Sequence, residues 1–220
     1  MGEAPGPRPL GILGGTFDPV HYGHLRLAEE ARGALGLERI LWLPAGQPPH
    51  REAPAVPASH RLELVRLAIA DNPAFALDDA EARSPAPSYT LTSLTRLREF
   101  NGAEKPLVLL LGADAFAGLC GWHRWRELFA LAHLGVATRP GYALDPGLLP
   151  PALADELRTR LRTDVGSLAR VPAGSIVPFA IAALDISATR IREMLVAGGS
   201  ARYLLPDPVL DYIAEHRLYR

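Results

Sequence analysis

Short apolar runs alternate along this sequence with stretches whose apolar residues recur at helical spacing. A run such as Leu107–Leu111 is typical of a buried strand, whereas leucines three residues apart, as in Tyr89–Phe100, are typical of a helix. Strands that alternate with helices are usually joined in parallel. We therefore expect an α/β fold, with a doubly wound, mostly parallel sheet that carries helices on both faces. In such sheets ligands bind beyond the carboxyl ends of the strands.

The expected elements span almost the whole sequence. The strands are Pro9–Leu13, Arg39–Leu43, Phe75–Leu77, Leu107–Leu111, Leu134–Ala137 and one within Ile176–Ile186. The helices are Tyr22–Leu35, Tyr89–Phe100, Trp122–Ala132, one near Ala152–Leu161, Ser187–Val196 and Pro208–His216. One more helix is expected after Ser59, which would cap it, and its buried side would include Leu62, Val65 and Ile69. At about 150 residues per domain, residues 1–220 predict a single domain. Residues 1–8 would be a loose tail, and residues from 187 to 220 a C-terminal helical part.

The charged residues and the cysteine exclude several classes of protein. The formal net charge of −1 gives no overall positive field for binding nucleic acid. Lys105 is the only lysine among 23 lysines and arginines, which excludes a Walker A loop and a conventional protein kinase. Any phosphate site must therefore use arginine, histidine and backbone N–H groups. Cys120 is the only cysteine, so an internal disulfide framework and a thiolate cluster for a metal are excluded as well.

The apolar runs predict no membrane contact. They are too short to cross a bilayer, and no secretory signal is visible, so we expect a cytoplasmic protein. The region 140–175 carries no motif, and the sequence leaves the oligomeric state open, a homo-oligomer included.

The most informative segment is Gly14–Leu25, which reads Gly-Gly-Thr-Phe-Asp-Pro-Val-His-Tyr-Gly-His-Leu. It follows the first expected strand and opens the first helix, where glycines let a ligand approach and free N–H groups favour phosphate. His21 and His24 are three residues apart, so they should face the same way and could donate hydrogen bonds to phosphate oxygens. Gly23 between them would leave room for a flat ring or a phosphate.

Taken singly, these residues have other interpretations. Asp18-Pro19 fits an ordinary turn, and the two histidines fit a solvent-exposed surface. A zinc site at His-x-x-His would lack a cysteine or a nearby pair of carboxylates to complete its ligands.

A second segment, Ile186–Arg192, opens a late helix. Ser187 is a good N-cap, and the hydroxyls of Ser187 and Thr189 with first-turn N–H groups would form a second anion cradle. Arg192 adds a planar, permanently charged fork that fits phosphate oxygens. Alone, the segment fits an ordinary capped amphipathic helix equally well. The two segments can act together only if the sheet brings both helix starts to one edge, so we expect His24 and Arg192 to line the same cleft.

The first segment resembles the signature of the nucleotidyltransferase superfamily with a His-x-Gly-His motif. Its Gly-Gly-Thr-Phe-Asp-Pro-Val-His form resembles the nicotinate-nucleotide adenylyltransferases of bacterial NAD synthesis. The second segment is similar to the Ile-Ser-x-Thr-x-x-Arg motif of the same superfamily, with Ala188 where many members have serine. The resemblance runs from about Leu10 to Tyr219 and implies a Rossmann-like nucleotidyltransferase fold.

The resemblance also implies a reaction and a set of site residues. The reaction transfers AMP from ATP, with Mg²⁺ carried on the ATP phosphates, to nicotinate mononucleotide, and it yields nicotinate adenine dinucleotide and pyrophosphate. The implied catalytic residues are His21, His24 and Arg192. The implied ATP and phosphate contacts are Gly14, Gly15, Thr16, Phe17, Gly23, Arg51, Gly112, Asp114, Ser187 and Thr189. The implied nicotinate nucleotide contacts are His50, Thr90, Leu91, Trp122 and His123, and no metal ligand on the protein is implied.

Two other functions stay open. One is adenylyl transfer to nicotinamide mononucleotide or to another phosphate acceptor such as phosphopantetheine, because main-chain groups decide between acid and amide. The other is a non-catalytic nucleotide-binding module. Neither nucleic acid nor a membrane is an expected partner.

Overall fold

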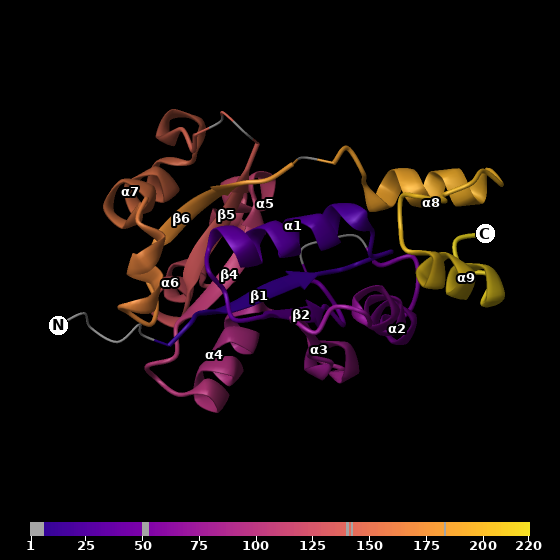
Figure 1. Cartoon of the computed structure of the whole chain (residues 1–220), viewed down its shortest axis with the longest axis horizontal. Coiled ribbons are helices and arrows are strands. Elements are labelled where there is room, and N and C mark those ends of the chain that lie inside the picture. The colour runs from indigo at the N-terminus through magenta and orange to yellow at the C-terminus, as the bar shows by residue number, and fades with distance from the viewer. Residues whose placement is uncertain (1–6, 50–52, 140, 142, 183) are drawn as a thin grey trace. The chain divides into compact units, whose positions relative to one another are not determined.

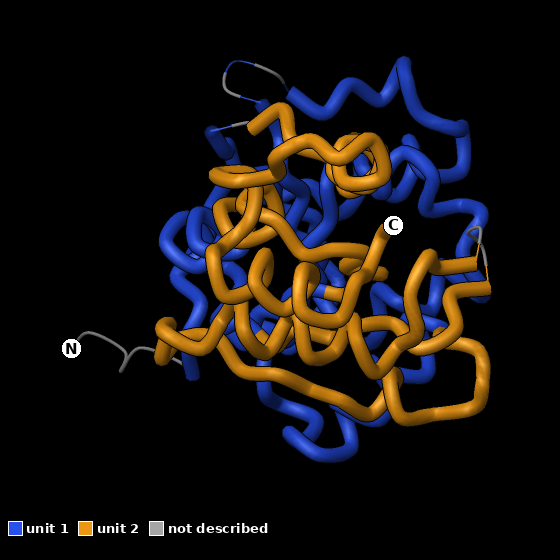
Figure 2. Tube along the Cα trace, turned by 90° about the vertical axis from the view of Figure 1, so that its right-hand side faces the viewer, with its two compact units in different colours: residues 1–13, 28–40, 89–182 blue, residues 14–27, 41–88, 183–220 orange. Residues whose placement is uncertain are grey.

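The computed structural model (Figure 1) describes residues 7–49, 53–139, 141, 143–182 and 184–220. The chain divides into two compact units, each assembled from three stretches of sequence (Figure 2). Unit 1 comprises Met1–Leu13, Ala28–Ile40 and Tyr89–Ala182, and unit 2 comprises Gly14–Leu27, Leu41–Ser88 and Ala183–Arg220.

The strands form one six-stranded sheet in the order β3-β2-β1-β4-β5-β6. They are β1 (Leu10–Gly15), β2 (Ile40–Pro44), β3 (Phe75–Leu77), β4 (Leu107–Gly112), β5 (His133–Thr138) and β6 (Ile176–Ala180). β1, β4, β5 and β6 run parallel, with Leu10 opposite Leu107 and Leu134 opposite Ile176. The chain proceeds from β1 to β3 at one edge and from β4 to β6 at the other, which is the doubly wound order. The predicted parallel α/β fold is confirmed.

Unit 1 contains most of the sheet's buried strand residues. Its helices are the later part of α1 (Tyr22–Ala34), α4 (Thr90–Asn101), α5 (Ala113–Ala117), α6 (Leu128–Leu131) and α7 (Pro151–Arg160), with 3₁₀ turns at Leu119–Gly121, Trp125–Glu127, Pro146–Leu148 and Val165–Ala169. The side chains of β5 are all buried, and α4 buries Leu91, Leu94 and Leu97. α4 ends before Gly102, whose φ of +85° is typical of a helix stop.

The predicted helix Trp122–Ala132 is wrong. Arg124 has a φ of +50°, a left-handed conformation that a right-handed helix cannot contain. A 3₁₀ turn at Trp125–Glu127 and the four-residue α6 therefore replace one continuous helix. Trp125 itself is buried.

Unit 2 contains the first turns of α1 together with the helices α2 (Ala58–Ile69), α3 (Ala80–Arg83), α8 (Ala188–Val196) and α9 (Asp207–Glu215). The expected cap of α8 is confirmed, because Ser187 Oγ accepts a hydrogen bond from the backbone N–H of Arg190 at 3.3 Å. The expected cap of α2 is wrong. That helix begins at Ala58 after Pro57 without a side-chain cap, so Ser59 already lies in its first turn.

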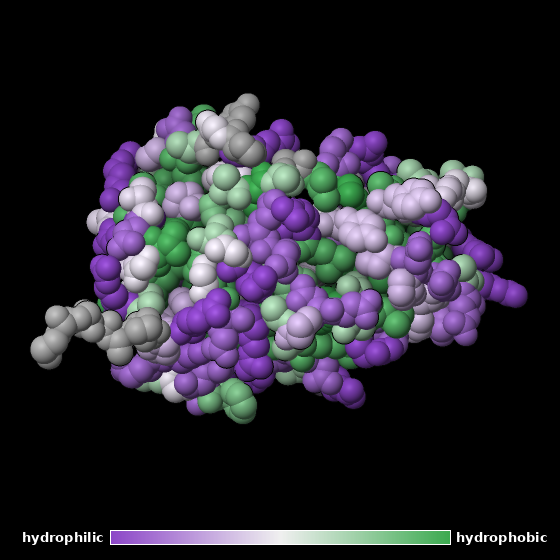
Figure 3. Space-filling view, viewed as in Figure 1, coloured by the Kyte–Doolittle hydropathy of each residue, from purple (hydrophilic) through white to green (hydrophobic). Residues whose placement is uncertain are grey.

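The surface shown in Figure 3 mixes hydrophilic and hydrophobic residues. The most exposed large apolar side chains include Phe100, Leu148, Val196 and Tyr203. Among the described residues, no helix is both long enough and apolar enough to cross a membrane.

Candidate active site

The loop between β1 and α1 is fixed in unit 2 by an aromatic side chain. Phe17 is 2% exposed, and its φ is +50°, which is uncommon outside glycine. Its ring centroid lies 5.3 Å from that of Trp42 and 5.1 Å from that of His24. A Cβ at Gly15 would approach the Phe17 ring to 2.9 Å, so this position requires glycine. At Gly14 nothing lies within 4 Å of the same point, so the backbone there is open to a ligand.

His21 and His24 form a pair at the start of α1. Their ring centroids are 3.8 Å apart and their planes differ by 30°, so they face the same way, as predicted. Nδ1 of His24 accepts a hydrogen bond from the backbone N–H of His21 at 3.3 Å. A neutral His24 therefore carries its proton on Nε2. A Cβ at Gly23 would lie 2.9 Å from Nδ1 of His21, so the imidazole of His21 takes the space that we expected a ligand to fill.

Burial makes His21 a neutral imidazole at physiological pH. His21 is 6% exposed, and its burial lowers the pKa of the imidazole to about 4. Among the described residues, its buried Nδ1 has no hydrogen-bond partner. Unpaired buried polar atoms are rare in folded proteins, and each needs an explanation. Because its pKa is low, His21 is neutral and contributes the dipole of its imidazole to the site, not a full positive charge.

The second motif lies against the first, inside the same unit. Nη1 of Arg192 donates to the carbonyl oxygen of Asp18 at 2.8 Å, and Nη2 lies 3.4 Å from Oγ1 of Thr189. The carbonyl oxygen of Ile186 is 3.6 Å from the point where a Cβ of Gly23 would stand. The two distant motifs therefore come together, as expected, whereas a cleft lined by both His24 and Arg192 stays a prediction. The starts of α1 and α8, with their N–H groups and partial positive charge, are thus close to each other.

Arg61 of α2 supports the loops of this site, and the sequence analysis missed it. Its side chain is almost fully buried, with the residue 1% exposed. Its guanidinium donates to four backbone carbonyls, those of Thr16 at 2.7 Å, Ala45 at 2.5 Å, Gly46 at 2.8 Å and Val56 at 3.2 Å. Burial lowers the pKa of Arg61, although arginine stays charged in proteins. One cation therefore joins the loop after β1 to the loops that follow β2.

Asp18 is the centre of a buried network that the sequence analysis also missed. Its Oδ1 accepts from the hydroxyl of Tyr219 at 2.7 Å, and its Oδ2 accepts from the backbone N–H of Ala55 at 2.7 Å. Burial and the bond to Asp18 raise the pKa of Tyr219 well above its ordinary value, so the hydroxyl stays a donor. No local signal marks this pair, because 201 residues separate its members.

The residues expected to bind the nicotinate nucleotide lie in unit 1 wherever the structure describes them. Thr90 and Leu91 begin α4, and Leu91 is 8% exposed, so much of its side chain belongs to the core. The ring of His123 lies 4.6 Å from that of Tyr89, which brings the segment of the half-buried Trp122 to the start of α4. Four of the five expected residues are therefore near one another. His50, and with it Arg51, lies outside the described residues.

Two further predicted residues follow β4 in unit 1. Gly112 is the last residue of this strand, and nothing lies within 4 Å of the point where its Cβ would be. Asp114 is exposed in the first turn of α5. An open backbone and an exposed carboxylate at the carboxyl end of a parallel strand are suited to a ligand.

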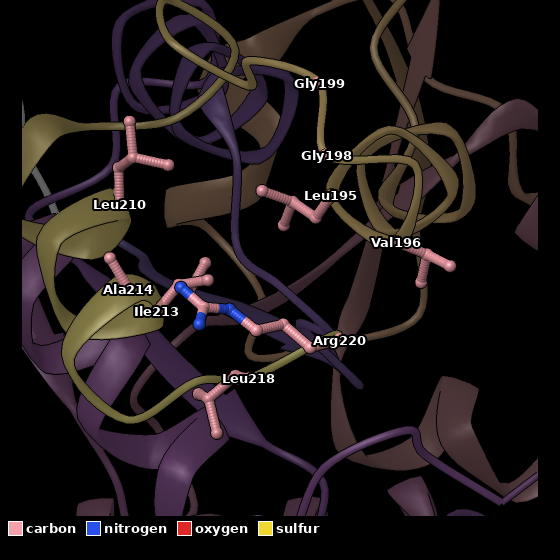
Figure 4. Close-up of a pocket in the computed structure, with 9 residues that line it drawn as sticks. All are labelled: Leu195, Val196, Gly198, Gly199, Leu210, Ile213, Ala214, Leu218 and Arg220. Atoms are coloured by element: carbon pink, nitrogen blue, oxygen red, sulfur yellow. The ribbon is translucent and has the colours of Figure 1, made fainter.

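A pocket of about 470 Å³ lies in unit 2 between the ends of α8 and α9 (Figure 4). Its lining is Leu195, Val196, Gly198, Gly199, Leu210, Ile213, Ala214, Leu218 and Arg220. None of the predicted site residues lines it, so the two motifs and this pocket are different features. Within the described part of the chain, no group of three or more His, Cys, Asp or Glu residues could hold a metal ion.

Comparison with known proteins identifies close relatives. The family model described as cytidylyltransferase-like matches residues 12–194. A Dechloromonas aromatica (strain RCB) protein named "Probable nicotinate-nucleotide adenylyltransferase" is 59% identical over 212 residues, which cover 96% of this chain and 98% of the relative. A protein of the same name from Halorhodospira halophila is 48% identical over 213 residues, which cover 96% of this chain and 95% of the relative.

A solved structure shares the fold. Plasmodium falciparum nicotinic acid mononucleotide adenylyltransferase complexed with NaAD superposes with a TM-score of 0.72 at 17% identity, covering 96% of this chain and 97% of that one. The sequence relatives match this chain over nearly its whole length, and both motifs meet in one unit. The chain belongs to the nicotinate-nucleotide adenylyltransferase family.

Proposed function

We propose that this protein transfers the AMP moiety of ATP to nicotinate mononucleotide and releases pyrophosphate, with nicotinate adenine dinucleotide as the product. The meeting of the two motifs in unit 2 carries this proposal. Two helix starts, two imidazoles and one guanidinium gather where a triphosphate needs hydrogen-bond donors. Membership of the family supports the pyridine nucleotide as the acceptor.

The reaction needs no protein nucleophile. An oxygen of the 5′-phosphate of the mononucleotide attacks the α-phosphorus of ATP in line. The bond from the α-phosphorus to the oxygen that bridges to the β-phosphorus breaks, and pyrophosphate leaves with the electron pair. Because the attacking phosphate is already ionised, no protein base has to remove a proton. The protein supplies positioning and charge stabilisation instead.

His24 acts at the α-phosphate in this proposal. Its Nδ1 accepts a hydrogen bond from the backbone, so its Nε2–H can donate to a phosphate oxygen. His21 packs against His24 with ring centroids 3.8 Å apart, and this contact fixes the orientation of the second imidazole. Thr16 and the backbone of Gly14, Gly15 and Phe17 complete the contacts of this loop with phosphate.

Arg192 holds the departing pyrophosphate together with Ser187 and Thr189. The bond to the carbonyl of Asp18 fixes the guanidinium, and two of its five N–H donors are engaged in the bonds described above. The remaining donors can bind phosphate oxygens as a planar fork. Ala188 lacks a hydroxyl, so only its backbone N–H can contribute.

Residues of unit 1 bind the nucleosides. Gly112 and Asp114 contact the nucleotide, with the carboxylate accepting from ribose hydroxyls. Trp122 stacks on the nicotinate ring, and main-chain groups at Thr90, Leu91 and His123 contact the mononucleotide. His50 and Arg51 are assigned to the ligands by the resemblance alone.

Magnesium enters as part of the substrate. Mg²⁺ prefers oxygen ligands and keeps several waters, so it is well suited to travel on the phosphates of ATP.

Pyrophosphate release tests the proposal. The full chain is incubated with ATP and Mg²⁺ and with nicotinate mononucleotide, nicotinamide mononucleotide or no acceptor, and pyrophosphate and dinucleotide are both quantified. We expect release with nicotinate mononucleotide and much less with the amide. Nucleotide binding without pyrophosphate release would replace the proposal with a binding module, and a preference for the amide would change the substrate.

His24→Ala tests the assigned role directly. Loss of a donor aimed at developing charge costs about 3 kcal/mol, so kcat should fall about 100-fold or more. His216→Ala is the matched control, because His216 is an exposed histidine of unit 2 outside both motifs. Turnover of His24→Ala within a few-fold of the control would contradict the role of His24.

A further inference from the structure

We propose that Tyr219 is a positioning residue for the adenylyl transfer. Its hydroxyl holds Asp18, and Asp18 in turn holds Arg192 and the loop between β1 and α1 that leads to His21 and His24, here called the histidine loop. This inference rests on the proposed function. It adds a residue that lies outside both motifs, in the expected C-terminal helical part.

The contacts of Asp18 give the route. Its two carboxylate oxygens accept from the Tyr219 hydroxyl and from the N–H of Ala55, both at 2.7 Å, and its carbonyl oxygen accepts from Arg192 at 2.8 Å. Asp18 is three residues before His21 and is 6% exposed. The Tyr219 hydroxyl binds the side chain of Asp18 and Arg192 binds its backbone carbonyl, so a shift of the Asp18 backbone would reach both the histidine loop and Arg192.

The environment of Tyr219 supports a positioning role. Tyr219 is 7% exposed, and its φ of +58° is a conformation that residues other than glycine rarely adopt. Its neighbours Leu218 and Arg220 line the pocket of Figure 4, whereas the Tyr219 hydroxyl reaches Asp18. The packing of its neighbours and one charge-assisted hydrogen bond hold this backbone in place.

The test removes one hydroxyl at a time. Tyr219→Phe deletes the donor to Asp18. Tyr212→Phe is the matched control, because Tyr212 is in the same part of unit 2 and its hydroxyl also bonds a side chain, Nδ1 of His60 at 3.0 Å. Both variants lose one hydrogen bond, and Tyr219→Phe should lose more stability in urea denaturation, because its bond is to a buried carboxylate. Only Tyr219→Phe should lower kcat for dinucleotide formation, by about tenfold, the size of coupling found within one hydrogen-bond network.

A double-mutant cycle shows whether Tyr219 acts through Asp18. Asp18→Asn alone should lower kcat, and adding Tyr219→Phe to it should cause little further loss. If Tyr219→Phe does not fold, the kcat of Asp18→Asn relative to Tyr212→Phe decides the question. Equal kcat values for Tyr219→Phe and Tyr212→Phe, or fully additive losses in the cycle, would overturn the proposal.

A titration of the imidazoles by NMR separates this inference from the proposed function. Movement of the loop would expose His21, so its pKa should rise from about 4 toward 6.5 in Tyr219→Phe and stay unchanged in Tyr212→Phe. This readout needs no turnover. A wild-type chain that forms no dinucleotide would refute the proposed function alone, whereas an unchanged His21 titration in Tyr219→Phe would refute the positioning role.

Discussion

Replacing Gly23 with alanine separates helix stability from the geometry of the histidine pair. Gly23 is the second residue of α1, and alanine is favoured over glycine inside a helix by at most about 1 kcal/mol. The new methyl group, however, would lie 2.9 Å from Nδ1 and 3.0 Å from Cε1 of His21. Ordinary contacts begin near 3.4 Å, so the imidazole must move by about 0.5 Å. That shift changes how His21 packs against His24.

The matched control is Gly33→Ala in the same helix, where nothing lies within 4 Å of the new Cβ. We expect both variants to change the free energy of unfolding in urea by about 1 kcal/mol or less. A misplacement of 1 Å can cost about 100-fold in rate, so kcat/KM for pyrophosphate release should fall about tenfold or more in Gly23→Ala alone. Equal activity of the two variants would refute the importance of the His21–His24 geometry.

Two further predictions concern stability. The free energy of unfolding should fall by about 2 kcal/mol between pH 7 and pH 5 because of His21, whose pKa is about 4 when folded and 6.5 as the ordinary value. As the pH falls, the His21 imidazole is protonated in the unfolded chain before it is protonated in the folded chain, so acid favours unfolding. Urea titrations of the wild type and of His21→Asn at both pH values measure the free energy of unfolding. The same pH dependence in both proteins would contradict this prediction. Arg61→Met should cost about 3 kcal/mol or more, because four buried carbonyls lose a charged donor. A loss under about 1 kcal/mol in the same assay would show that these bonds contribute little.

The order of strands and helices could be predicted from the sequence because its signals are local. Apolar runs mark β4 and β5, and Gly102 and Ser187 mark a helix end and a helix start. The errors have physical causes. Pro57 allows α2 to begin before Ser59, and the left-handed conformation of Arg124 interrupts a stretch whose composition favours a helix. Neither conformation can be derived from apolar spacing.

The candidate site was predictable only where its residues belong to motifs. The Gly14–Leu25 and Ile186–Arg192 segments could be located, and their meeting could be expected from the topology of a parallel sheet. Tyr219 gives no such signal, because its partner is 201 residues away. For Arg61, the structure differs from the expected helix face: α2 buries Arg61 and Leu64, whereas we expected it to bury Leu62. A charge on a buried helix face indicates a partner, but the sequence does not identify which carbonyls it binds.

A crystal structure of the full chain with a non-hydrolysable ATP analogue and Mg²⁺ tests the central claim most directly. We predict that one triphosphate contacts His24 and the backbone near Thr16 at one end and Ser187 and Arg192 at the other. A triphosphate bound away from either motif, or one that contacts only one of them, would contradict the account.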